Sequence, residues 1–158
     1  YLVNLEKEYS LIKKKRPMFS KPESRKVRWV LNDNYMLFWF RFIYPNQSML
    51  ELKKFQLLKE YILDNYEQFS GLILERYFQE KMSETEDITD IGNYWDKKGE
   101  NEIDIIALNH LRKTAIVAEV KRNPQKIDLN ALSRKAEVLT KYLGKYKVGL
   151  CGFSLEDM

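Results

Sequence analysis

The sequence predicts an α/β domain in which a helix, three strands, a second helix and a last strand follow one another. Three observations lead to this class: helical spacing of apolar residues before residue 83, β-branched alternating runs after residue 93, and a helical pattern followed by one more strand after Asp128. With 158 residues and 44% hydrophobic content, the chain can fill one core of ordinary domain size and a smaller appended piece.

The first 47 residues are predicted to form an appended piece rather than a core. An apolar-periodic start is followed by a basic loop that contains Pro17 and Pro22. Short strands are expected over residues 10–17 and 26–31, paired as a ribbon. An aromatic-rich run over residues 35–45 then requires burial against a partner surface, within the chain or in a second copy. Packing explains this run better than base stacking, because it contains few charges.

Two helices are expected next. Ser48 and Glu51 have the spacing of a capping box, and apolar residues recur at helical spacing afterwards, so a helix is predicted over residues 49–65. A second helix is expected to begin at Ser70 or Gly71 and to end near Met82. An exposed acidic loop follows over residues 83–90.

The remaining segments predict the sheet and the second helix. Strands are expected near residues 94–95, over residues 102–108 and over residues 115–122, with the last two joined as a hairpin. Asp128 is expected to cap a helix that Gly144 ends, and residues 147–153 form the final strand. His110 falls in the hairpin turn, where a solvated side chain is expected.

Charge and composition set limits on the class of protein. The net charge is +4 and the pI about 9.0, and an acidic stretch over residues 80–104 lies between basic stretches over residues 13–28 and 112–147. This pattern suits a metal centre with phosphate-binding walls, although a charge run is ordinarily a solvated face. No signal peptide or long apolar segment is seen, and the lone Cys151 excludes an internal disulfide, so a cytoplasmic protein without membrane contact is expected. A start at Tyr1 indicates a processed protein or, more simply, a fragment.

Four charged residues lie inside the apolar strands and are the candidates for chemistry. Side chains two apart share a face of a strand, so Glu102 with Asp104, and Glu119 with Lys121, are expected to point together. Charges placed in apolar runs cost several kcal/mol unless they are paired or bound to a metal. A cross-strand salt bridge is the ordinary explanation of such a pattern. The functional explanation is that these side chains form a shared acidic centre.

The functional reading implies a hard divalent cation. Carboxylate oxygens suit Mg²⁺ or Mn²⁺, so Asp104, Glu119 and Glu102 are candidate ligands. Glu75 would add a further carboxylate if its helix packs across the same edge of the sheet. Lys121 is placed to orient a water or to stabilise developing charge in phosphodiester cleavage.

The runs E-I-D-I-I-A and A-E-V-K resemble the PD-(D/E)xK nuclease signature, in which strand-borne acids precede an acid-x-lysine pair. The resemblance implies a restriction-endonuclease-like core. It further implies metal ligands at Asp104 and Glu119, a catalytic Lys121 with both acids taking part, and an auxiliary acid at Glu75. Ile103 stands where the signature has proline.

A second resemblance covers nearly the whole chain. The segments D-N-Y-M-L-F-W-F-R-F-I-Y-P-N, G-N-Y-W-D-K-K-G-E-N-E-I-D-I-I-A-L and A-E-V-K are similar to the C-terminal region of archaeal-type AAA+ ATPases, where a nuclease-like domain follows an ATPase core and a winged helix. It implies that residues 1–47 are the end and wing of that winged helix with an aromatic connector, and that residues 48–158 are the nuclease-like domain. In relatives a residue on the following helix contacts phosphate, which Arg134 or Lys135 would do here, with Arg122 as a further nucleic-acid contact. No Walker A loop is present, so ATP hydrolysis is not expected of this chain.

The leading hypothesis is therefore a DNA-directed, magnesium-dependent phosphodiesterase domain that works with the ATPase domain of the same full-length protein. The alternative is a catalytically silent module that binds nucleic acid or protein and regulates that ATPase. A secreted toxin-like fragment is disfavoured by the absence of a secretion signal. Whether the domain forms a homodimer stays open.

Overall fold

The computed structural model describes residues 1–158 and divides them into two compact units. The first unit contains residues 1–15 and 28–73, and the second contains residues 16–27 and 74–158. The expected boundary after residue 47 falls inside the first unit. The difference arises because the helix that follows that boundary packs, over its first part, with the aromatic run that precedes it.

The first unit begins with a short helix and a two-stranded ribbon. Helix α1 (Leu2–Lys7) leads to strand β1 (Ile12–Lys15), which pairs antiparallel with β2 (Arg28–Leu31). The expected ribbon is thus confirmed. The basic loop between the two strands, residues 16–27, belongs to the second unit.

The aromatic run is helical and packs within the chain. It forms α2 (Asn34–Phe38), the π-helix η1 (Trp39–Ile43) and the 3₁₀ helix η2 (Tyr44–Asn46), and α3 (Gln47–Glu51) follows directly. Phe42 is fully buried, and its ring centroid lies 5.2 Å from that of Phe69. Phe38 contacts the same ring at 5.8 Å, edge to face. These contacts support the packing interpretation of the run.

A single helix, α4 (Phe55–Ser83, 29 residues), replaces the two helices that the sequence predicted. The break expected near Ser70 and Gly71 was wrong. The Ser70 hydroxyl donates to the Tyr66 carbonyl at 2.6 Å instead of capping a new helix, and a single glycine inside a helix costs only about 1 kcal/mol. The predicted start at residue 49 was also early, because Lys53, with φ of 54°, separates α3 from α4. No helix of the chain, α4 included, has the length and apolar character needed to cross a membrane.

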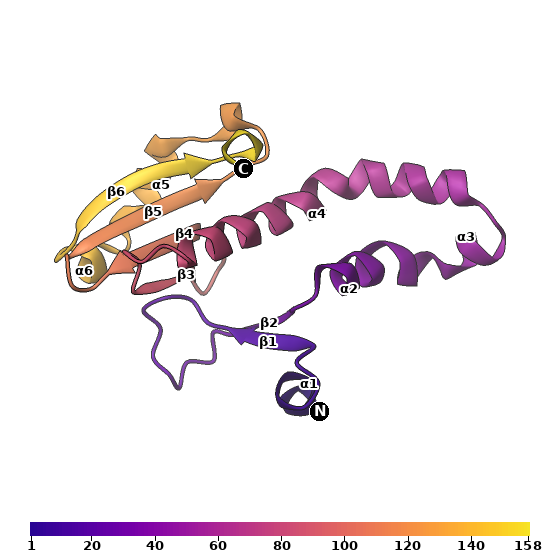
Figure 1. Ribbon diagram of the computed structural model, residues 1–158, viewed down its shortest axis with the longest axis horizontal. Coiled ribbons are helices and arrows are strands. Elements are labelled where there is room, and N and C mark those ends of the chain that lie inside the picture. The colour runs from indigo at the N-terminus through magenta and orange to yellow at the C-terminus, as the bar shows by residue number, and fades with distance from the viewer. The chain divides into compact units, whose positions relative to one another are not determined.

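The second unit is built on a four-stranded mixed sheet, so the protein has a mixed α/β fold (Figure 1). The strand order is β3-β4-β5-β6, antiparallel from β3 to β5, with β6 parallel to β5. The predicted meander and final strand are confirmed. The bounds are β3 (Asp90–Trp95), β4 (Glu102–Asn109), β5 (Thr114–Val120) and β6 (Lys147–Phe153).

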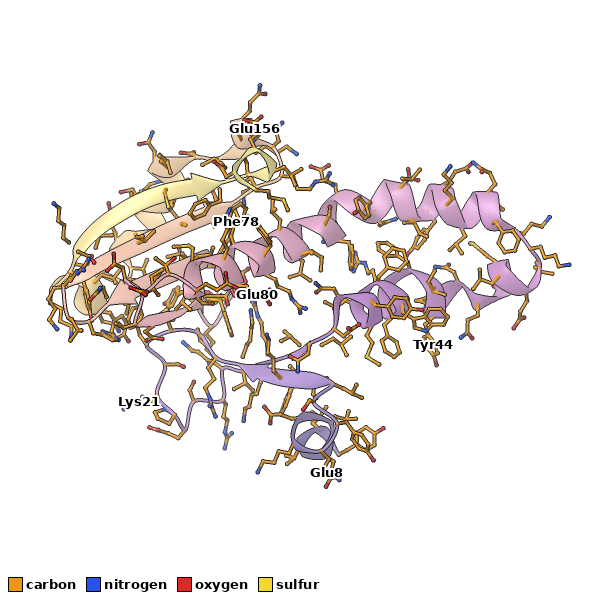
Figure 2. The ribbon with its side chains drawn as sticks, viewed as in Figure 1. Glu8, Lys21, Tyr44, Phe78, Glu80 and Glu156 are labelled. Carbon is orange, nitrogen blue, oxygen red and sulfur yellow. The ribbon has the colours of Figure 1, made fainter.

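Helices cover both faces of this sheet. The second part of α4 packs on one face, where Phe78 lies between the helix and the strands and stacks on Phe153 at 4.7 Å (Figure 2). On the other face lie α5 (Leu129–Glu137) and α6 (Thr140–Leu143), with Leu132 and Leu139 fully buried. The short 3₁₀ helices η3 (Pro124–Lys126) and η4 (Leu155–Asp157) complete the unit.

Asp128 caps α5 as predicted, since its carboxylate accepts from the backbone N–H groups of Asn130 and Ala131. The single helix expected as far as Gly144 is, however, split in two. A turn at Val138 and Leu139 divides α5 from α6, yet Leu139 keeps its place in the core. Burial of the same apolar face therefore continues across the break.

A β-bulge interrupts β4 just before its centre. Gly92 of β3 pairs with Ile106, whereas Tyr94 pairs with Ile103, so Asp104 and Ile105 together oppose one residue of β3. Ile103 and Ile106 consequently both face α5, while Ile105 faces α4. Strict alternation is lost here, so the two-residue spacing of Glu102 and Asp104 no longer predicts a shared face.

Gly152 of β6 is required by a close approach. It lies opposite Glu119 in the register of β5 and β6, and a Cβ at this position would overlap the side chain of Ile127. Ile127 directly precedes the cap residue Asp128. The glycine thus lets the segment that leads into α5 settle against the strand pair next to Glu119.

We expect Gly152→Ala to lower the free energy of unfolding by about 1–3 kcal/mol, because the overlap with Ile127 forces the segment before α5 outward. Urea denaturation measures this. Gly149→Ala, on the same strand but with its nearest neighbour at 3.9 Å, is the matched control and should change little. Adding Ile127→Ala to Gly152→Ala should recover part of the loss. Equal effects of the two alanine substitutions would contradict the overlap.

Candidate functional site

Four charged side chains gather at the end of β5, where the β4 bulge also lies. Asp104 comes from the bulge, Glu119 from β5, and Lys121 from the residue after β5 ends. Lys135 reaches them from α5. Lys121 still follows the sheet, because its backbone N–H donates to the Phe153 carbonyl at 2.9 Å. We call these four residues the acid–lysine site.

Glu119 is the centre of the acid–lysine site. Only 8% of its side chain is exposed, on the face that carries α5. Its Oε1 lies 3.2 Å from the Lys121 Nζ and 3.4 Å from the Lys135 Nζ, and its Oε2 accepts from the Asp128 backbone N–H at 3.3 Å. Burial of this carboxylate is tolerated because two ammonium groups and a backbone donor replace water.

Asp104 is held through its side chain and its backbone. Its Oδ2 accepts from the backbone N–H of Val120 at 2.8 Å, which joins the bulge to β5. Its carbonyl oxygen accepts from the Gln79 side chain of α4 at 2.8 Å and from the Asn93 side chain of β3 at 2.9 Å. The two amides satisfy the carbonyl of a bulged residue and thereby fix the direction of the carboxylate.

The surroundings of Asp104 shift the pKa of its carboxyl group. Burial raises the pKa of the Asp104 carboxyl above its ordinary value, and the negative charge of Glu119 acts in the same direction. The Val120 N–H and the ammonium groups of Lys121 and Lys135 lower the pKa but do not cancel the shift. The folded protein therefore stabilises the charged form of Asp104 less well than water does.

The structure brings together Asp104, Glu119, Lys121 and Lys135, but not the other expected ligands. No group of three acidic, histidine or cysteine side chains is assembled that could hold a metal. The charge of Glu75 on α4 acts on the adjacent Arg76, and Glu102 is exposed opposite Trp95 in the register of β3 and β4. Glu102 was expected beside Asp104 because a regular strand was assumed, and the bulge removes that regularity. Glu75 was expected there only if its helix crossed the same edge of the sheet.

The expected nucleic-acid contacts are distributed around the acid–lysine site. Arg134 is exposed in the last turn of α5, and Arg122 is half-buried directly after Lys121. Lys135 differs, because it pairs with Glu119. His110 is exposed in the hairpin turn, as predicted, and its Nδ1 lies 2.8 Å from the Tyr146 hydroxyl.

Sequence reasoning missed three contributions to the site. It did not foresee Gln79 and Asn93 as supports of the bulge, or Lys135 as a partner of Glu119. A signal for Asn93 was its polar amide within a strand opposite the E-I-D run. For Lys135, the signal was its place two turns after the cap of a helix that must follow the Glu119 strand. Nothing in the local sequence marks Gln79.

The donor set fits a hard divalent cation that keeps most of its water. Asp104 and Glu119 offer carboxylate oxygens on neighbouring strands, and Mg²⁺ is commonly bound through one or two carboxylates with water and substrate phosphate. Burial, and to a lesser extent the charge of Glu119, raises the pKa of Asp104, and a nearby cation would favour the charged carboxylate. The absence of a third acid excludes a closed cage of protein ligands.

Fold and site together define a mixed α/β protein whose central strands carry a lysine-compensated pair of carboxylates. Residues 39–140 match the family model DUF234, described as Archaea bacterial proteins of unknown function, and the chain belongs to this family. It is also 36% identical over 128 residues to an uncharacterized protein of Methanocaldococcus jannaschii. That match covers 77% of this chain but 28% of the relative, so the chain spans less than a third of that protein's length. No solved structure matches the chain.

The raised pKa of Asp104 gives a stability effect with a definite sign. Because the folded state holds the Asp104 proton more tightly than the unfolded state, stability from this group falls as the pH rises above the ordinary value of 3.8 and through the raised pKa. We expect Asp104→Asn, which can still accept from the Val120 N–H, to become more stable relative to the parent over that window. Urea denaturation at a series of pH values measures the difference. A difference that stays constant or moves the other way would contradict the burial argument.

Glu119→Gln, unlike Asp104→Asn, should make the protein less stable. It leaves Lys121 and Lys135 close together without the carboxylate that both contact, so we expect a loss of about 1–3 kcal/mol in the free energy of unfolding at neutral pH. Adding Lys135→Met should restore part of the loss, because it removes one of the two unpaired charges. Stabilisation by Glu119→Gln alone would show that the lysines do not compensate the buried carboxylate.

Proposed function

We propose that this chain is a DNA-directed, metal-dependent phosphodiesterase domain of the PD-(D/E)xK type. The observation that carries the proposal is the convergence of Asp104, from the bulge of one strand, with Glu119 and Lys121, from the next. An acid followed on the neighbouring strand by an acid-x-lysine pair is the arrangement expected of that signature. The same carboxylates would be costly to bury for packing alone.

The order and pairing of the elements support a restriction-endonuclease-like core. Helix α4 precedes the antiparallel strands β3, β4 and β5, and α5 then connects β5 to the parallel strand β6. The candidate residues lie on the two central strands, where a helix covers each face and the backbone is most rigid. Such a position holds a reacting geometry better than a loop does.

In this proposal Asp104 and Glu119 would hold Mg²⁺ or Mn²⁺, which would supply the positive charge needed to polarise a phosphoryl oxygen and to lower the pKa of a water. Lys121 is 38% exposed and held by Glu119, so its ammonium can donate to a phosphate oxygen or orient the attacking water. Lys135 keeps Glu119 in position as its second partner. Exposed Arg134 and half-buried Arg122 contact the phosphate backbone on either side.

We further propose that the domain works within a longer AAA+ protein. The chain covers 28% of the relative that it matches, which leaves length for an ATPase domain there. The β1–β2 ribbon, with exposed Lys13 and Lys14, has the form and charge of the wing of a winged helix. In this proposal the wing would bind DNA on the same polypeptide that carries the nuclease-like domain.

A catalytically silent regulatory module is the second candidate, and one observation favours it. Both lysines contact the same oxygen of Glu119, and no third acid joins the site, so the four charges already form a compensated ion-pair network. Such networks perturb pKa values without catalysis. In this reading Asp104 and Glu119 order the strands, and nucleic acid is bound but not cut.

The decisive assay incubates the chain with single-stranded, duplex and branched DNA in the presence of Mn²⁺. We expect cleavage that Asp104→Ala and Lys121→Ala each abolish, because one removes a cation ligand and the other the ammonium beside the phosphate. Lys97→Ala, an exposed lysine of the turn between β3 and β4, is the matched control and should cut normally. Equal activity in the parent, Asp104→Ala and Lys121→Ala would remove the assignment.

Calorimetric titration with Mn²⁺ separates the two candidates when no cutting is found. Binding that Asp104→Ala eliminates supports the metal site, whereas no binding at millimolar concentration with retained DNA affinity favours the silent module.

A further inference from the structure

A second basic surface lies in the same unit as the acid–lysine site, around α6 and the 16–27 loop. It consists of two concavities of about 350 Å³ and 500 Å³, which share Phe19, Lys141 and Tyr142. The first extends over the loop that carries Lys21 (Figure 2), and the second extends toward His110. The two concavities are adjacent because they share these residues, and we call them together the basic groove.

Aromatic rings hold lysines in place along the basic groove. Tyr142 stacks parallel on Phe19, with ring centroids 4.6 Å apart, and the Lys141 Nζ lies 4.7 Å from the centre of the Tyr142 ring. Tyr146 has the Nζ of Lys145 at 5.5 Å and that of Lys113 at 5.9 Å. Cation–π contacts of this kind keep ammonium groups near a surface that would otherwise let them move freely in water.

The charge of the basic groove is positive. Lys21, Lys26, Lys141 and Lys145 line it and are exposed, and Glu23 and Asp90 are its acids. The Asp90 carboxylate lies 3.8 Å from the His110 imidazole, so its charge is directed at the ring beside the groove. An anion with several charges spaced along a chain matches this lining better than a compact anion does.

The basic groove is separate from the acid–lysine site. Tyr146 precedes β6, whose first residue pairs with Thr114 at the start of β5, whereas Glu119 lies five residues farther along β5. At about 3.3 Å per residue the two places are roughly 17 Å apart along the strand. That span corresponds to a few nucleotides of an extended strand, so one strand can reach both places.

We propose that the basic groove binds a single strand of nucleic acid, with the lysines on its phosphates and the rings of Tyr142 and Tyr146 beside its bases. Spaced cations among aromatic rings are the features by which proteins hold single strands, and an acidic peptide has no use for the rings. The lysine chains that cover the rings can move aside to admit a base and then pair with the adjoining phosphate. The inference rests on the proposed function, to which it adds the form of the substrate, a strand that is unpaired beside the cleavage site.

The test measures binding without cleavage. A fluorescein-labelled oligothymidylate is titrated with the chain in EDTA, and fluorescence anisotropy is followed at several salt concentrations. Lys141→Gln with Lys145→Gln removes two phosphate contacts, so the slope of log affinity against log salt should shrink by about 1.4. The fall in affinity between about 50 and about 200 mM salt should then be about sevenfold smaller than in the parent.

Lys54→Gln with Lys59→Gln is the matched control, because it removes two exposed lysines of the first unit that do not line the groove. Thermal unfolding followed by circular dichroism verifies that both double variants are folded. The proposal would be overturned if the two double variants had equal salt slopes. It would also be overturned if poly-glutamate displaced the labelled oligonucleotide as effectively as unlabelled oligonucleotide does. Groove-dependent binding in a chain that never cuts DNA would instead support the groove and remove only the nuclease assignment.

Discussion

The buried carboxylate of Glu119 is the constraint around which the second unit is arranged. A strand facing α5 can carry this charge only because Lys121, Lys135 and the cap of α5 all converge on it. The convergence ties the end of β5 to the start of the next helix, and Gly152 makes the close approach sterically feasible. Contacts of the Glu119 side chain thus connect β5, the residue that follows it and the start of α5.

Asp104 is held by hydrogen bonds rather than by direct contacts with lysine side chains. Its position is set by hydrogen bonds to Val120, Gln79 and Asn93, which come from two strands and a helix. These bonds fix the carboxylate without neutralising it, and burial leaves its pKa raised. The two acids of the site are thus held in different ways, Glu119 by two ammonium groups and a backbone N–H, and Asp104 by a backbone N–H on its carboxylate and two side-chain amides on its carbonyl.

Much of the second unit followed from the sequence because its signals are local. Period-two runs located β4, β5 and β6, and Asp128 marked the start of α5. The continuity of α4 could not be predicted, because Ser70 and Gly71 resemble a boundary until tertiary packing holds them in a helix. The bulge is invisible as well, since it depends on how β3 aligns with β4. Hence Asp104, Glu119 and Lys121 could be proposed together from spacing, while Glu102 was grouped with them on an alternation that the pairing breaks.

The bulge also makes the number of residues in β4 decisive for the position of Asp104. Ile103 and Ile106 lie in the core that faces α5 and Ile105 lies in the core that faces α4, so Asp104 is the residue of the bulge that is left for the hydrogen bond to the Val120 N–H. Loss of one residue at this point would remove either Asp104 itself or the fully buried Ile105. The number of residues in the bulge therefore cannot change without loss of the carboxylate or of core packing.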